Sequence, residues 1–157
     1  MKVTLLTIGK TEEAYLQTGI STYSKRLERY TTFTIKEIPA LKNAKNLSEE
    51  QQKNKEGELL LEQISGGDVL FLLDEKGKEF DSIAFSKFFQ QHMNNSVKHL
   101  IFAVGGPYGF SDQVYKRATG KISLSKMTFS HQMVRLFFVE QMYRAFTILK
   151  NEPYHHS

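Results

Sequence analysis

Residues 68–74, Asp-Val-Leu-Phe-Leu-Leu-Asp, form an apolar run without the polar–apolar alternation of a half-buried strand. Residues 97–104, Val-Lys-His-Leu-Ile-Phe-Ala-Val, form a second run of the same kind. Short continuous runs like these are typical of strands that are buried on both faces, as in a parallel sheet. The two runs therefore predict a parallel sheet at the centre of the protein.

Strand-like and helix-like patterns alternate along the chain around these two runs. Further strands are expected at residues 2–8, 33–38 and 121–125. Helices are expected at residues 12–30, 49–64, 81–93, 112–118 and 130–150. This alternation predicts a single α/β domain over residues 1–157, with a mainly parallel sheet and helices on both faces. General rules for such chains favour an open sheet of the Rossmann or flavodoxin kind.

Several residues are expected to mark the ends of these elements. Ser48 is expected to cap the helix at residues 49–64, because Gln51 stands at the capping-box position. Gly77 is expected to mark a turn after the strand, and Pro153 is expected to end the last helix.

The composition is that of an ordinary globular protein. Of 157 residues, 40% are hydrophobic and none is cysteine, so disulfides and thiolate metal sites are excluded. The formal net charge of +4 permits a nucleic-acid partner, although an ordinary basic domain fits it equally well. The apolar run at residues 3–8 is too short for a signal peptide. We expect a cytoplasmic protein with no membrane segment and no metal.

Residues 105–109, Gly-Gly-Pro-Tyr-Gly, form the first candidate site. They follow a buried strand and precede a helix that Ser111 or Asp112 would cap. Ligands of open α/β sheets bind at the carboxyl ends of such strands, and glycines allow the backbone to approach a ligand closely. The spacing differs from GxGxxG and from the P-loop, which argues against a dehydrogenase-like nucleotide enzyme. A tight turn without any ligand is an equally good interpretation.

Residues 124–129, Leu-Ser-Lys-Met-Thr-Phe, form the second candidate site. Apolar and polar residues alternate here, so backbone groups could read the edge of an adenine base. The side chains of Leu124, Met127 and Phe129 could then flank its face. A strand-to-helix connection whose apolar side chains fill the core is the alternative, and the pattern alone favours it.

The last helix, at residues 130–150, is apolar on nearly all sides. A helix of this kind must be buried on more than one side, which predicts a two-fold homodimer interface. A central core helix in a monomer is the alternative. Glu140 and Arg144 are spaced for a simple surface ion pair. Tyr154 and His155, which follow the helix, could contact an unstacked RNA base, or they could form a frayed terminus.

Together, these segments form a more specific pattern than any one of them does alone. The pieces are Lys2 to Gly9, Lys55-Glu56-Gly57, Val104-Gly105-Gly106, Leu124 to Phe129, His131 to Arg135, Glu140 to Ala145 and Pro153-Tyr154-His155. The pattern resembles the SPOUT-class ribosomal RNA large subunit methyltransferase H family over essentially the whole chain. This resemblance implies methylation of N3 of a pseudouridine in helix 69 of 23S ribosomal RNA, at a site of the position 1915 type. It also implies a homodimer and a trefoil knot near the C-terminus.

The resemblance further implies which residues form the site. S-adenosylmethionine, the methyl donor, would be bound by Leu73, Gly105, Leu124, Ser125, Lys126, Met127, Thr128 and Phe129. The catalytic residues would be His155, Tyr154 and Arg144, while His131 and Arg135 would bind RNA. Orientation of the reactants is expected to dominate the mechanism. The rival function is a nonenzymatic ribosome-binding factor, which would not bind the donor.

Overall fold

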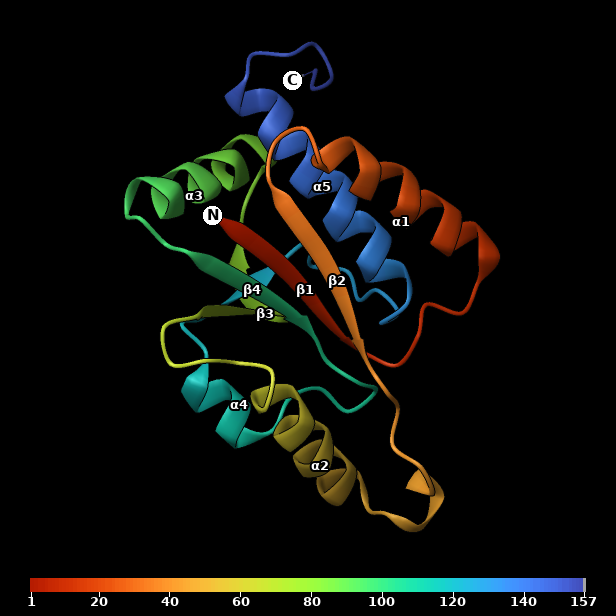
Figure 1. The fold of residues 1–157 in the computed structure, drawn as a ribbon. Helices are drawn as coiled ribbons and strands as arrows, with labels where there is room; N and C mark the ends of the chain where they lie inside the picture. Colours follow the sequence, from red (N-terminus) through yellow and green to blue (C-terminus); the bar gives the residue numbers. More distant parts are fainter. Residues whose placement is uncertain (157) are drawn as a thin grey trace.

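In the computed structural model, which describes residues 1–156, five parallel strands form the centre of the fold. The strands are β1 (Lys2–Ile8), β2 (Thr32–Ile38), β3 (Val69–Glu79), β4 (His99–Val104) and β5 (Gly120–Ser123). Their order in the sheet is β2-β1-β4-β3-β5 (Figure 1). All pairs of neighbouring strands are parallel, as the two apolar runs predict.

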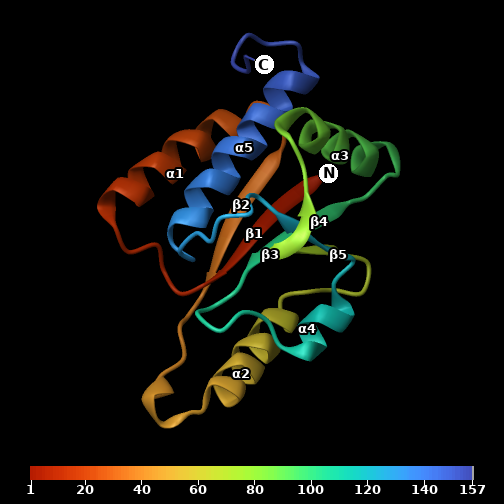
Figure 2. The same cartoon turned by 180° about the vertical axis from the view of Figure 1, so that it is seen from behind.

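Helices cover both faces of the sheet. They are α1 (Ala14–Leu27), α2 (Glu49–Leu61), α3 (Ser82–Asn94), α4 (Asp112–Arg117) and α5 (Met133–Leu149), with a short 3-10 turn η1 (Ala44–Asn46). One face carries α1, α3 and α5, and the opposite face carries α2 and α4 (Figure 2). This confirms the predicted α/β class, while the trefoil knot stays a prediction.

β4 shows why the central strands lack alternation. Leu100 and Phe102 belong to the core beneath α1, α3 and α5. Ile101 and Ala103 belong to the second core, beneath α2 and α4. Each of these four side chains is at most 1% exposed. Because both faces of the strand meet a helix layer, every position favours an apolar residue.

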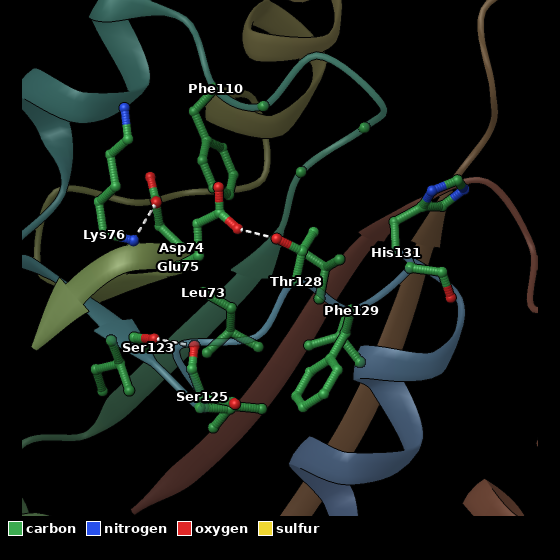
Figure 3. Close-up of a pocket in the computed structure, with 18 of the residues that line it drawn as sticks. Leu73, Asp74, Glu75, Lys76, Phe110, Ser123, Ser125, Thr128, Phe129 and His131 are labelled. Carbon is green, nitrogen blue, oxygen red and sulfur yellow. Dashed lines mark hydrogen bonds between the residues drawn. The ribbon is translucent and has the colours of Figure 1, made fainter. Parts of the chain in front are cut away.

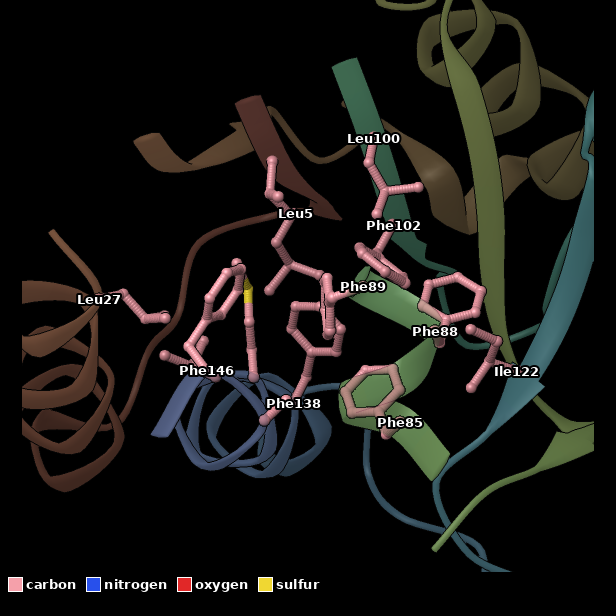
Figure 4. Packing of buried hydrophobic residues seen from close by; sticks show 14 of the residues in the cluster. Leu5, Leu27, Phe85, Phe88, Phe89, Leu100, Phe102, Ile122, Phe138 and Phe146 are labelled. Carbon is pink, nitrogen blue, oxygen red and sulfur yellow. The ribbon is translucent and has the colours of Figure 1, made fainter. Parts of the chain in front are cut away.

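α5 lies in the helix layer between α1 and α3 (Figure 1). Its Phe138 contacts Phe102 of β4, with ring centroids 4.7 Å apart, within a cluster of aromatic side chains (Figure 4). Full burial of one such side chain contributes about 1.5–3 kcal/mol. The central core position thus accounts for much of the apolar character of α5. Phe137, by contrast, remains 42% exposed on its outer side.

Side-chain caps fix the starts of two helices. The Ser48 hydroxyl accepts a hydrogen bond from the backbone N–H of Gln51 (3.1 Å), and the Gln51 side chain accepts one from the Ser48 N–H (2.9 Å). This capping box confirms the predicted start of α2. Ser111 rather than Asp112 caps α4, because its hydroxyl accepts a hydrogen bond from the Val114 N–H (3.3 Å).

Two expected chain breaks are wrong. Gly77 lies within β3 rather than in a turn. A Cβ at this position would lie 2.6 Å from the backbone nitrogen of Ile122, so glycine permits the close approach of β3 and β5. Pro153 does not end α5, because the helix already ends at Leu149. Asn151 then takes a left-handed conformation, with φ of 55°.

Candidate active site

The carboxyl ends of β4 and β5 and the middle of β3 surround a cavity of about 630 Å³ (Figure 3). Its walls come from residues 73–76 of β3, where the pairing with β5 shifts register, from the loop at residues 104–110 and from the connection from β5 to α5. Three segments that are distant in the sequence meet here because parallel strands direct their carboxyl ends to one edge of the sheet.

Most residues that the family resemblance assigned to the donor lie on this cavity. The lining includes Leu73, Gly105, Leu124, Ser125, Met127, Thr128 and Phe129. Lys126, from the same segment, is exposed and does not belong to the lining. His131, which was expected to contact RNA, lies on the lining as well. The structure therefore brings most of these residues together on one cavity, while their binding of the donor stays a prediction.

The connection from β5 to α5 is held by its own hydrogen bonds. The Ser123 hydroxyl donates to the Ser125 carbonyl (2.7 Å), and the Ser125 hydroxyl accepts from the Met127 N–H (3.0 Å). Phe129 stacks on Phe137 of α5, with ring centroids 4.8 Å apart. Met127 is 76% exposed, so it does not fill the core. Its own hydrogen bonds therefore hold the segment in place, and it lines the cavity as well as connecting β5 to α5.

Two carboxylates that the sequence analysis missed stand at the β3 side of the cavity. Asp74 accepts a hydrogen bond from the Tyr115 hydroxyl (2.6 Å), and Glu75 accepts one from the Thr128 hydroxyl across the cavity (Figure 3). Burial, followed by the hydrogen bond to Asp74, raises the pKa of Tyr115, which keeps the phenol protonated. Among residues 1–156, neither carboxylate has a basic side chain within 4.0 Å. Within the described residues, both carboxylates thus lie on the cavity wall without an ion-pair partner, and Lys76 lies on the same wall.

Arg135 does not lie where an RNA-binding residue should. Its side chain is 1% exposed, and its guanidinium donates to the backbone carbonyls of Ile8, Gly9 and His131, each at 3.0 Å. Burial lowers the pKa of the guanidinium, and the Glu37 carboxylate 3.8 Å away opposes that shift. The expected RNA contact is thus corrected, because Arg135 fastens the start of α5 to the end of β1.

Comparison with protein families gives a match over nearly the whole chain. The family model described as "Predicted SPOUT methyltransferase" matches residues 1–155. The chain belongs to the SPOUT methyltransferase family. A methyltransferase requires a methyl donor, and the cavity is a place in this SPOUT methyltransferase where segments of β3, β4 and β5 meet.

Individual relatives of this SPOUT methyltransferase are similar over their full length. The chain is 61% identical over 156 residues to the ribosomal RNA large subunit methyltransferase H of Flavobacterium johnsoniae, covering 99% of each protein. Proteins of the same name from Flavobacterium psychrophilum and Parabacteroides distasonis are 62% and 60% identical, with the same coverage. These matches confirm the resemblance that the sequence motifs indicate.

The three residues expected to be catalytic lie together at the far end of α5. The Arg144 guanidinium is 2.6 Å from Oε1 of Glu140, and it lies 4.7 Å from the ring centroid of Tyr154. The Tyr154 hydroxyl also donates to Glu140 (3.0 Å). Arg144 Nη1 donates to His155 Nδ1 (3.1 Å).

This tail cluster, consisting of Glu140, Arg144, Tyr154 and His155, is separate from the cavity. Arg144 follows the cavity-lining Val134 by ten residues, which is about 15 Å along a helix axis. The C-terminal tail lies beyond the end of α5 that points away from the cavity (Figure 1). Burial, followed by hydrogen bonds to Tyr23 and Glu140, raises the pKa of Tyr154. The residues predicted to be catalytic therefore do not line the cavity in this chain.

The described part of this SPOUT methyltransferase, residues 1–156, contains no cluster of three or more His, Asp or Glu side chains arranged for a metal ion. Across the same residues, no helix is both long and apolar enough to cross a membrane.

Proposed function

We propose that this SPOUT methyltransferase transfers a methyl group from S-adenosylmethionine to N3 of a pseudouridine in 23S ribosomal RNA. The observation that carries the proposal is the cavity where Leu73, Gly105 and residues 124–129 other than Lys126 converge. The names of the relatives support ribosomal RNA as the substrate, since they describe large subunit methyltransferases. The sequence motifs that resemble the family support the pseudouridine.

The cavity fits S-adenosylmethionine in size and chemistry. Its volume of about 630 Å³ lies within the usual range of about 300–1,000 Å³ for small-molecule sites. Leu73, Leu124 and Phe129 offer apolar surface to an adenine ring. The Asp74 and Glu75 carboxylates, which lack a basic partner among residues 1–156, offer charge to a cationic ligand. When bound there, S-adenosylmethionine supplies a reactive methyl group on a positively charged sulfur.

The residues of the chain have two tasks in this reaction. The first is to hold the pseudouridine N3 in line with the methyl group, which can contribute about 7–11 kcal/mol in ideal cases. The second is to remove the proton that N3 carries, because the nitrogen attacks with the lone pair that this proton occupies. His131 is the one imidazole among the described residues that line the cavity. We assign it the task of accepting that proton.

A second subunit would bring the tail cluster to the cavity. Arg144 lies about 15 Å along the axis of α5 from Val134 of the cavity, and Tyr154 and His155 contact Arg144. Next to the cavity, Met127 and Phe137 expose apolar surface, at 76% and 42% exposure. Exposed apolar surface of this kind favours association. In a two-fold dimer, the tail of the partner would stack on the RNA base and contact its phosphates.

The proposed substrate is tested with ribosomes from cells that lack the corresponding methyltransferase. Purified protein and S-adenosylmethionine with a labelled methyl group should place label in large-subunit RNA. Digestion should recover the label on the pseudouridine base. Donor binding without any label in this RNA would contradict the proposed substrate. Absence of donor binding would contradict the proposed donor.

The shared site is tested with mixed dimers. One variant protein carries Gly105→Val, which fills the cavity. The other carries Tyr154→Ala, which removes the aromatic ring of the tail. Each variant alone should be inactive. Mixing the two should restore about a quarter to half of the activity, because some dimers then contain one intact cavity and one intact tail. Mixtures that stay inactive, although mixed dimers form, would mean that each subunit works alone.

A further inference from the structure

Glu56 of α2 is a buried acid that the proposed function does not use. It belongs to the Lys55-Glu56-Gly57 segment and is 5% exposed. Its Oε1 has no hydrogen-bond partner among the described residues, and its Oε2 is 3.5 Å from the Gln52 amide nitrogen. An unpaired buried polar atom costs free energy, so its retention calls for a reason.

The Glu56 carboxyl lies directly against the glycine loop of the cavity. A Cβ at Gly106 would be 2.5 Å from Oε1 and 2.7 Å from Oε2. Glu56 also lines a small space of about 10 Å³, and Gly105, Gly106 and Gly109 line it on the loop side. The carboxyl therefore forms the support beneath Gly105 and Gly106, on the side of the loop opposite to the cavity.

Gly57 supports the other end of the same loop. A Cβ at Gly57 would clash with the hydroxyl oxygen of Ser111, the residue that caps α4. Glu56 and Gly57 thus contact the beginning and the end of residues 105–111. Two neighbouring residues of α2 fix the position of the whole loop relative to the sheet.

The surroundings of Glu56 favour its neutral form. The one other titratable side chain that lines the small space is Lys53 of the same helix, and its ammonium is 3.0 Å from Glu50. The loop contributes only glycines, Phe110 and Ser111, and β1 contributes Ile8. With no charge opposite it, burial raises the pKa of the Glu56 carboxyl. A neutral carboxyl can lie against a backbone without the cost of a buried charge.

We propose that Glu56 is a positioning residue of the donor site, whose buried carboxyl holds Gly105 and Gly106 in the conformation that binds the methyl donor. This inference rests on the proposed function, because it acts on the same cavity. Glu56 would touch neither the donor nor the RNA. Its effect would appear in donor affinity and not in the reaction of the bound substrates.

The test compares three variants on α2 in donor binding. Glu56→Ala removes the support, Glu56→Gln keeps its shape without an ionisable group, and Glu58→Gln is a control on an exposed acid of the same helix. Calorimetry with S-adenosylmethionine should show about tenfold weaker binding for Glu56→Ala. Glu56→Gln and Glu58→Gln should stay within about twofold of the wild type. Kinetics of Glu56→Ala should show a raised KM for the donor at unchanged kcat.

The pH dependence separates positioning from a purely structural role. Above the pKa of Glu56 the wild-type carboxyl ionises, so donor affinity should fall as the pH rises. Glu56→Gln should not show this fall. Equal pH profiles for the two proteins, or wild-type donor affinity in Glu56→Ala, would overturn the inference. Absence of donor binding in the wild type would instead contradict the proposed function.

A second variant keeps the test valid if Glu56→Ala does not fold. Gly106→Ala places a methyl group against the Glu56 carboxyl and should weaken donor binding by about tenfold. Adding Glu56→Asp, which withdraws the carboxyl by one methylene, should recover most of that loss. If the double variant binds the donor no better than Gly106→Ala, the contact does not position the loop.

Discussion

The two ends of α5 each carry an arginine, and the two arginines have different surroundings. At the beginning of the helix, Arg135 is buried and bound to backbone carbonyls, next to an open cavity. At its end, Arg144 is partly exposed and bound to Glu140 and His155 within the tail cluster. The two arginines are nine positions apart, which places them about 180° apart around the helix. Arg135 faces the sheet and bonds to backbone carbonyls, while Arg144 lies on the opposite side of the helix and is partly exposed.

This difference bears on the proposed separation of donor binding from RNA binding. The cavity is lined by segments that follow or interrupt neighbouring strands of the sheet. The tail cluster pairs its own charges, since Glu140 contacts both Arg144 and Tyr154. It can act on a substrate only when a partner or an RNA approaches it.

The largest expected difference between the two ends lies in donor binding. Gly105→Val should weaken S-adenosylmethionine binding at least about 100-fold, because a Cβ there already lies 3.3 Å from the Phe110 ring. Tyr154→Ala should leave the donor affinity within about twofold and abolish methylation of ribosomes. Calorimetry and label transfer measure the two effects. If Tyr154→Ala weakens donor binding as strongly as Gly105→Val, the separation of the two ends is wrong.

The two arginines should differ strongly in their contribution to stability. Arg135→Met should lower the free energy of unfolding by about 2–4 kcal/mol, because it leaves several backbone carbonyls without donors. Arg144→Met should change it by less than about 1 kcal/mol, because that ion pair is partly exposed. Urea unfolding followed by circular dichroism provides both values. Equal losses of unfolding free energy for the two variants would contradict the view that Arg135 stabilises the fold and Arg144 does not.

A smaller effect should distinguish the charge of the cavity from its shape. Asp74→Asn should weaken the binding of S-adenosylmethionine about tenfold, since it removes one of two negative charges near a cationic ligand. The affinity for S-adenosylhomocysteine, which lacks the sulfonium charge, should change much less. Asp112→Asn on α4 is the matched control. Equal weakening of both ligands would show that Asp74 acts through hydrogen bonds alone.

The smallest expected effect concerns the anchoring of the tail. Tyr30 donates a hydrogen bond to Glu152 (2.6 Å), and burial, followed by this bond, raises the pKa of Tyr30 from 10.0 to about 12. The folded state therefore binds the phenolic proton more tightly than the unfolded state. This contribution to stability is complete below pH 10 and is lost as the pH rises to about 12. Tyr30→Phe should lose less stability than the wild type over that range in thermal unfolding. A steeper loss in Tyr30→Phe would contradict the assignment.

Local patterns predicted the elements well. The apolar runs of β3 and β4 and the capping box at Ser48 are signals within a few neighbouring residues, and the structure confirms them. The cavity segments were also located, although only the joint motif pattern favoured a ligand over a turn. Asp74 and Glu75 were missed. The available signal was the presence of two acids directly after a buried strand, at the edge of the sheet where ligands bind.

The sequence by itself determined the α/β class and the parallel sheet, because burial on both faces leaves continuous apolar runs and helix starts leave capping residues along the chain. The joint pattern of motifs located the segments that surround the cavity. The tertiary structure alone decided that Gly77 lies against β5, that Arg135 is buried and that the tail cluster lies away from the cavity. Each of these facts depends on contacts between residues that are distant in the sequence. The same arginine or glycine has the same local pattern whether such a contact forms or not.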